Sequence, residues 1–125
     1  MKEADRALKI GYGPEDILFP LWGRCYSIMD KGYRYEVCPF QEARQNSAKL
    51  GSYSTHSFGT ETNKIHGETD TVVSMQFRDG DFCFANKKPR SMEVKLVCGL
   101  ETTLDNLVEP EVCSYSAVLS TPLLC

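Results

Sequence analysis

The sequence predicts an all-β domain, a flattened barrel or sandwich of two antiparallel sheets that disulfide bonds hold together. From Ile17 onward, apolar residues recur with a period of two in short runs separated by turn residues, which is typical of antiparallel sheets. The chain also has six cysteines at wide intervals, with no Cys-x-x-Cys or Cys–His pair at metal-ligand spacing. Its 125 residues suffice for one hydrophobic core, so we expect a single domain.

The composition narrows the cellular setting and the partners. An even number of widely spaced cysteines is typical of an oxidising compartment, so we expect a protein of the secretory pathway. A net charge of -3 without a basic stripe argues against nucleic acid as a partner. No apolar run approaches the roughly 18 residues of a membrane span. We therefore expect no membrane partner, and no motif indicates a cofactor.

The first residues follow a different pattern. Residues 2–10 have helical spacing, and Gly11-Tyr12-Gly13-Pro14 ends it. We interpret residues 1–16 as a short N-terminal helix, the end of a longer upstream helix, followed by a linker, and residues 17–125 as the folded domain. Because residues 1–5 lack the apolar stretch of a signal peptide, we expect a piece of a longer secretory protein.

Residues 24–29 and 33–38 predict a β-hairpin. They flank Asp30-Lys31-Gly32, a three-residue connection with glycine where a positive φ is needed. Cys25 and Cys38 then face each other across the hairpin, and a bond between them should stabilise the fold by roughly 3 kcal/mol. The polar, aperiodic residues 41–71 predict mostly loop, with short strands near 50–53 and 56–58.

Four clearer strands follow, at residues 72–77, 82–85, 92–99 and 112–119. The residues Arg78 to Asp81 predict a hairpin turn between the first two, and a longer loop ending in Glu109-Pro110 precedes the last. Alternation places two sets of side chains in the core: Met92, Val94, Leu96 and Cys98 from the third strand, and Cys113, Tyr115, Ala117 and Leu119 from the fourth.

Motifs for catalysis or metal binding are weak. His56 and His66 lie in the predicted polar loop, where we expect solvated side chains rather than the base of a nucleophile. Carboxylates are numerous enough that chance pairs do not indicate a glycosidase. The Arg78-Asp79-Gly80-Asp81 turn lacks the other ligands of a calcium loop. We therefore expect a non-enzymatic domain with no catalytic residue and no metal.

Four polar residues stand where the pattern favours other types: Gln45, Arg90, Glu109 and Tyr115. Arg90 begins a strand in phase with core residues, and Tyr115 points inward. A planar amide, a guanidinium, a carboxylate and a phenol together complement the hydroxyls of a pyranose, which both donate and accept hydrogen bonds. The four residues therefore predict a sugar site.

Several motifs resemble those of the mannose 6-phosphate receptor homology (MRH) lectins, a family of small sugar-binding domains. They extend over most of the chain: Gly23-Arg24-Cys25-Tyr26, Tyr33-Arg34-Tyr35-Glu36-Val37-Cys38-Pro39-Phe40 with Gln45, Phe77-Arg78-Asp79-Gly80-Asp81-Phe82-Cys83, Arg90-Ser91, Leu96-Val97-Cys98-Gly99, Glu109-Pro110, Cys113-Ser114-Tyr115 and Thr121-Pro122-Leu123-Leu124-Cys125. The resemblance implies a flattened barrel with three disulfides: Cys25–Cys38, Cys83–Cys113 and Cys98–Cys125.

The same resemblance implies mannose as the ligand. It assigns Gln45 and Arg90 to the axial 2-hydroxyl, and Glu109 and Tyr115 to the 3- and 4-hydroxyls. Phe84 is a candidate additional contact, because a related subunit has an aromatic residue near the sugar at that place.

Within this family, the chain resembles the β subunits of glucosidase II most, on the segment up to Leu21 and on Cys98-Gly99-Leu100-Glu101-Thr102. The implied role is non-catalytic. Such a subunit holds high-mannose N-glycans of glycoproteins in the endoplasmic reticulum lumen while a catalytic α subunit removes glucose. Two alternatives stay open: the γ subunit of N-acetylglucosamine-1-phosphotransferase, and a mannose 6-phosphate receptor domain, for which Lys87 and Lys88 offer positive charge.

Overall fold

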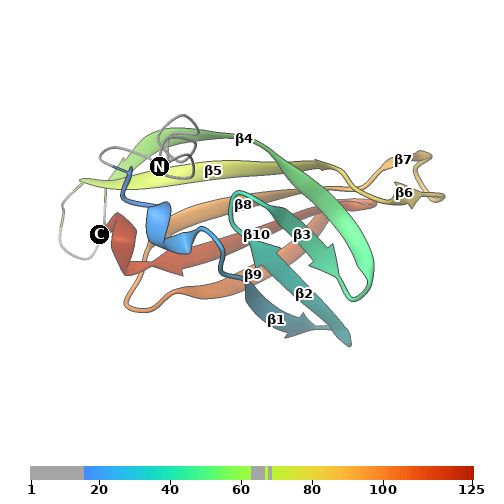
Figure 1. Cartoon of the computed structure of the whole chain (residues 1–125), viewed down its shortest axis with the longest axis horizontal. Coiled ribbons are helices and arrows are strands. Elements are labelled where there is room, and N and C mark those ends of the chain that lie inside the picture. Colours follow the sequence, from blue (N-terminus) through green and yellow to red (C-terminus); the bar gives the residue numbers. More distant parts are fainter. Residues whose placement is uncertain (1–15, 63–66, 68) are drawn as a thin grey trace.

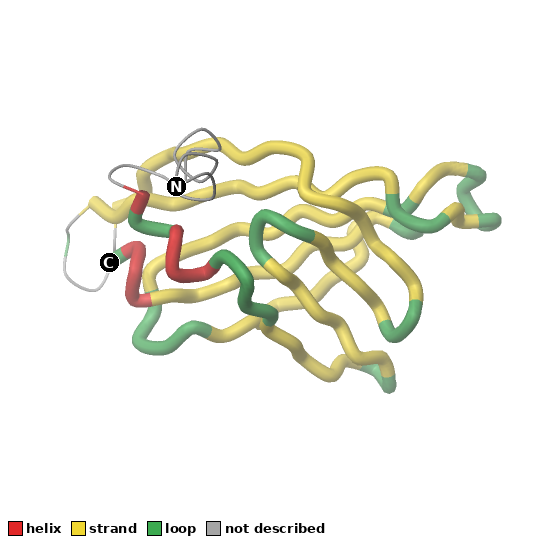
Figure 2. The backbone as a smooth tube through the Cα atoms, in the orientation of Figure 1, coloured by secondary structure: helices red, strands yellow, loops and turns green. Residues whose placement is uncertain are grey.

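A computed structural model describes residues 16–62, 67 and 69–125 of the chain, and the expected helix at residues 2–10 lies outside this part. Strands dominate the described residues, and short 3-10 helices such as η2 (Phe19–Leu21) and η3 (Pro122–Leu124) lie near each other at one end of the molecule (Figure 2). Within the described ranges, no helix has the length and apolar character needed to cross a membrane.

The strands form one large curled sheet and a small ribbon. They are β1 (Tyr26–Asp30), β2 (Tyr33–Cys38), β3 (Glu42–Gln45), β4 (Ala48–Thr62), β5 (Thr69–Asp79), β6 (Phe82–Cys83), β7 (Lys88–Pro89), β8 (Ser91–Cys98), β9 (Thr103–Glu111) and β10 (Ser114–Thr121). The large sheet has the order β1-β2-β3-β4-β5-β8-β10-β9, and β6 pairs with β7. Its edge strands β1 and β9 contact each other, which nearly closes a barrel (Figure 1). The predicted flattened barrel is therefore confirmed.

One pair in the large sheet is parallel. β10 pairs with β8 in parallel, from Ser114 opposite Ser91 to Thr121 opposite Cys98, and with β9 in antiparallel orientation. β10 thus inserts between two strands that precede it in the chain. Alternation within one strand carries no information on strand order, so the sequence pattern did not predict this arrangement.

The core fills the space between the two sides of the curled sheet. Met92, Val94 and Leu96 are buried as alternation predicts, and Tyr115 is only 6% exposed. The buried cluster consists of Leu18, Leu21, Tyr35, Val37, Phe40, Ala43, Leu50, Val73, Met75, Phe77, Met92, Val94, Leu96, Leu104, Tyr115, Ala117, Leu119 and Leu124. Burial of this apolar surface is the main stabilising contribution to the fold.

All three disulfides implied by the resemblance are present: Cys25–Cys38, Cys83–Cys113 and Cys98–Cys125. The first joins the residue before β1 to the last residue of β2. The second joins the end of β6 to the connection between β9 and β10, and the third joins the last residue of β8 to Cys125, after η3. Cross-links of this kind stabilise chiefly by restricting the unfolded chain.

The loop predicted over residues 41–71 is wrong. Most of this stretch belongs to β3, β4 and β5, and β4 pairs with β5 from Gly51 opposite Asp79 to Thr62 opposite Thr69. Beyond a bulge after Tyr53, nearly every described residue of β4 is exposed. A strand whose two faces are largely in solvent has no reason to alternate apolar and polar residues, so the sequence of β4 resembles that of a loop.

Three turns also differ from their predictions. Asp30 pairs with Tyr33, so the hairpin connection is the two residues Lys31 and Gly32, with φ of 49° and 84°. Positive φ at both positions is the mark of a type I′ turn, whose twist suits paired strands. Residues 78–81 do not form a hairpin turn, because β6 pairs with β7 rather than β5. Residues 109–110 belong to β9 rather than to a loop.

Candidate functional site

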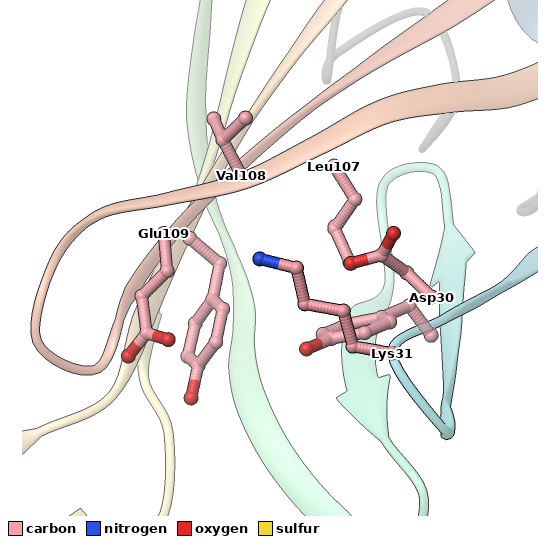
Figure 3. A pocket seen from close by; sticks show the side chains of 7 residues that line it. Asp30, Lys31, Leu107, Val108 and Glu109 are labelled. Atoms are coloured by element: carbon pink, nitrogen blue, oxygen red, sulfur yellow. The ribbon is translucent and has the colours of Figure 1, made fainter.

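A cavity of ≈ 60 Å³ lies where the edge strands of the barrel meet. Its lining comes from the β1–β2 turn, from β2 and from the last two strands of the sheet: Asp30, Lys31, Tyr35, Leu107, Val108, Glu109 and Tyr115. Figure 3 shows Glu109 on one side and Asp30 on the other, with the Lys31 side chain reaching into the space between them. Two of the four predicted sugar-binding residues, Glu109 and Tyr115, therefore line one cavity.

A bulge in β9 places Glu109 at this cavity. Ser114 of β10 pairs with Glu111 and Ser116 pairs with Val108, so Glu109 and Pro110 together face the single residue Tyr115. Bulges re-aim side chains, and proline is tolerated in them because the ladder loses a hydrogen bond there anyway. The carboxylate is held further by the backbone N–H of Cys113, which donates to Glu109 Oε2 at 2.7 Å.

Gln45 reaches the site through Tyr35. The two residues are paired across β2 and β3, and Gln45 Nε2 donates to the Tyr35 hydroxyl at 2.9 Å. The Tyr35 ring in turn lies 6.1 Å from the Tyr115 ring, at an interplanar angle of 54°. Because the amide nitrogen of Gln45 donates to Tyr35, the amide oxygen points away from Tyr35 and remains an acceptor.

Arg90 connects the site to the small ribbon. Its Nη1 donates to the carbonyl oxygens of Phe82 at 2.9 Å and Asp81 at 3.3 Å, and its backbone N–H donates to Asp81 O at 3.0 Å. Its Nε is buried and has no hydrogen-bond partner among the described residues. Buried donors are almost always paired in folded proteins, so this unpaired Nε is an exception.

The pKa values of two tyrosines show that these groups share one environment. Burial raises the pKa of Tyr115, the negative charge of Glu109 raises it further, and a hydrogen bond and the positive charge from Arg90 oppose both effects. Burial also raises the pKa of Tyr35, against a lowering contribution from its hydrogen bond with Gln45. Gln45, Arg90 and Glu109 thus act on the phenols of Tyr35 and Tyr115, whose pKa values lie above the ordinary value of about 10.

The raised pKa values predict a loss of stability at alkaline pH. The folded state favours the protonated phenols, so their contribution is complete below the unfolded pKa of about 10 and is lost as pH rises through the folded pKa. In a titration followed by tyrosinate absorbance, we expect a late component that Tyr35→Phe reduces. Above pH 10, the free energy of unfolding measured with denaturant should fall more steeply with pH for the wild type than for Tyr35→Phe. Equal slopes for the two proteins would contradict the prediction.

Phe84 and the lysine pair lie outside the cavity lining. Phe84 is 86% exposed and packs edge-on against Phe82, with ring centroids 5.0 Å apart. Lys87 and Lys88 are exposed at the ribbon formed by β6 and β7, at the opposite end of the long axis from η3 (Figure 1). None of these three side chains lines the cavity.

Sequence reasoning missed several residues of the site, namely Asp30, Lys31, Tyr35, Leu107 and Val108. Tyr35 shares the inward phase of Val37, and a tyrosine in a core phase is the signal that could have found it. Leu107 and Val108 lie on a strand that was predicted as loop, so no pattern pointed to them.

The prediction of a solvated loop is wrong for His56. The residue lies on β4, its Nδ1 is 2.6 Å from the Tyr53 hydroxyl, and its ring packs edge-on against Phe40 and Phe58. It therefore belongs to an aromatic cluster. His66 lies outside the described residues.

Comparisons with known proteins give the relatives of the chain. The family described as "Glucosidase II beta subunit-like protein" matches residues 2–125. The glucosidase 2 subunit beta of Oryza sativa subsp. indica is 38% identical over 118 residues, 94% of this chain and 18% of the rice subunit. The human N-acetylglucosamine-1-phosphotransferase subunit gamma is 33% identical over 108 residues, 86% of this chain and 35% of that subunit.

Among solved structures, the MRH domain of glucosidase II beta bound to mannose has the same fold. The TM-score is 0.66 at 23% sequence identity, and the match covers 86% of this chain and 98% of that domain. The chain spans about a fifth of the length of the rice subunit that it matches. Since the family match extends over nearly the whole chain and the fold agrees, the chain belongs to the glucosidase II beta subunit-like family.

Proposed function

We propose that residues 17–125 form a mannose-binding MRH lectin domain of a non-catalytic glucosidase II beta subunit. Membership of the family supports this proposal, as does the solved relative that was crystallised with mannose. The observation that carries it is the buried, unpaired Nε of Arg90 beside the Tyr115–Glu109 cavity. A site built to receive a polyhydroxylated ligand holds donors and acceptors whose partners arrive with that ligand.

In this proposal, two pairs of residues contact different hydroxyls of the mannose. Gln45 and Arg90 read the axial 2-hydroxyl, through an amide oxygen that accepts and a guanidinium that donates. Glu109 and Tyr115 take the 3- and 4-hydroxyls, through a carboxylate that accepts from both and a phenol that donates. Phe84 is proposed as an additional contact at the edge of a larger glycan, because its exposed ring offers an apolar face.

The proposed cellular role is recruitment. The domain holds high-mannose N-glycans of glycoproteins in the endoplasmic reticulum lumen, and the catalytic alpha subunit then trims glucose from a substrate at raised local concentration. The three disulfides support an oxidising compartment. No residue of the domain takes part in the hydrolysis in this proposal.

The test is a comparison of two sugars that differ only at the 2-hydroxyl. Nuclear magnetic resonance titration of the domain should show binding of methyl α-mannoside, and binding of methyl α-glucoside weaker by about tenfold or more, because the equatorial hydroxyl leaves buried polar groups unpaired. Gln45→Ala should narrow this difference, while Gln41→Ala, at an exposed position outside the cavity, is the matched control. Equal binding of both sugars, or of neither, would refute the proposal.

A second candidate is the gamma subunit of N-acetylglucosamine-1-phosphotransferase, which the 33% identity to the human subunit favours. The relative of that name would use the same lectin fold beside a different catalytic partner. Co-purification of the full-length protein from its own cells separates the two. Recovery of a glucosidase supports the first candidate, and recovery of a phosphotransferase supports the second.

A further inference from the structure

Lys31 occupies a backbone position that favours other residues. It is the first central residue of the β1–β2 turn, with φ of 49°, followed by Gly32 with φ of 84°. Type I′ turns prefer asparagine, aspartate or glycine at this position, because a lysine in the left-handed region is strained. A residue that departs from the preferred turn chemistry points to a role other than forming the turn.

The closure of the barrel brings this lysine to the sugar site. β1 contacts β9, so the turn after β1 lies beside Leu107, Val108 and Glu109 of β9. The Lys31 side chain extends into the cavity between Asp30 and Glu109 (Figure 3). The ion pairs found among residues 16–62, 67 and 69–125 do not include Lys31, so its ammonium is available to a ligand oxygen.

The charges around the cavity favour an uncharged ligand. Asp30 and Glu109 contribute two carboxylates, which oppose Lys31 in the lining and the guanidinium of Arg90 beside Tyr115. A phosphate in the cavity would be attracted by the lysine but repelled by both carboxylates, and this repulsion lowers its affinity. An ammonium with three donors instead suits the hydroxyl and ring oxygens of a neutral sugar.

We propose that Lys31 is a further specificity-determining residue of the mannose site, and that its ammonium donates to an oxygen of an uncharged sugar held against Tyr115 and Glu109. This inference rests on the proposed lectin function. The four residues proposed above lie on β3, on β9, on β10 and just before β8. Lys31 adds a fifth contact, from the β1–β2 turn.

The experiment compares Lys31→Asn and Lys31→Met with the wild type by titration with methyl α-mannoside. Asparagine suits the turn and removes the ammonium, and methionine keeps most of the chain length without charge. Both variants should bind about tenfold more weakly, because a charged donor is lost. The melting temperature of Lys31→Asn should equal or exceed that of the wild type. Arg34→Met, which removes an exposed charge from the same hairpin outside the cavity, should bind within about twofold of the wild type.

The possible outcomes distinguish a failure of the role proposed for Lys31 from a failure of the proposed lectin function. If the wild type does not bind methyl α-mannoside, the proposed lectin function fails. If the wild type binds and Lys31→Asn binds equally well, or Arg34→Met loses as much, only the role of Lys31 is refuted. Tighter binding of mannose 6-phosphate than of the mannoside, lost in Lys31→Met, would also refute it, because the lysine would then read an anion.

Discussion

Arg90→Met is expected to abolish detectable mannoside binding by the domain. The variant removes the donors that the proposal assigns to the 2-hydroxyl, and it removes the hydrogen bond and charge that act on Tyr115. Each hydrogen bond from a charged group contributes about 1.5–3 kcal/mol. A lectin with a millimolar dissociation constant has only about 4 kcal/mol of binding free energy in total. The loss of even one such bond weakens binding by about tenfold or more, which takes a millimolar ligand out of the detectable range.

The control for Arg90→Met has to separate binding from folding, because the Arg90 guanidinium also donates to the carbonyl oxygens of Phe82 and Asp81. Arg90→Lys keeps the charge but lacks the planar fork, so it too should lose binding while it remains folded. Arg78→Met removes an exposed arginine on β5 and should leave binding unchanged. If a folded Arg90→Met binds methyl α-mannoside like the wild type, the assignment of Arg90 is wrong.

Gly51→Ala is expected to destabilise the fold by about 3 kcal/mol, the upper end of the range that overpacking typically costs. A Cβ at Gly51 would lie 2.5 Å from the backbone carbon of Phe77 and 2.7 Å from Arg78 N, on a neighbouring strand that cannot move aside. β5 is held by pairing with β4 on one side and β8 on the other, and Phe77 is fully buried. A Cβ at Gly80 would likewise lie 2.5 Å from the carbonyl group of Leu50.

Gly59→Ala is the matched control on the same strand. Its Cβ would make an ordinary contact at 3.6 Å with Val72 Cγ2, and the position is exposed, so the change should stay within about 0.5 kcal/mol. Denaturant unfolding under identical redox conditions measures both values. A Gly51→Ala variant as stable as Gly59→Ala would show that β4 and β5 separate more easily than their pairing indicates.

The strands that border the core were predictable, and the exposed ones were not. Met92, Val94 and Leu96 alternate with polar residues because one face of β8 is buried, and that contrast is visible in the sequence. β4 has no such contrast beyond Tyr53, so its residues lack a signal although they pair fully with β5. Strand order depends on contacts between distant segments, which is why the parallel pairing of β8 and β10 was not foreseen.

The candidate site was also predictable only in part, because local patterns reveal polar groups in core positions but not contacts between distant segments. Arg90 and Tyr115 were singled out because each is a polar group in a core phase, and both adjoin the site. The sequence pattern places Glu109 and Pro110 at the end of a loop, whereas the bulge in β9 accommodates both within the strand. Lys31 reaches the cavity only because β1 closes against β9, a contact between opposite ends of the sheet. No pattern within the hairpin contains that information.

The insertion of β10 between β8 and β9 has a consequence for biosynthesis. A ribosome delivers the chain from the N-terminus, so β9 is complete before the strand that will separate it from β8 exists. Cys25 and Cys38 can be oxidised early, but Cys83 and Cys98 must await Cys113 and Cys125, which lie on either side of β10. Non-local pairing of this kind folds slowly and leaves unpaired strand edges exposed meanwhile. Tyr115 arrives with β10, so the cavity is completed only when β10 is in place between β8 and β9.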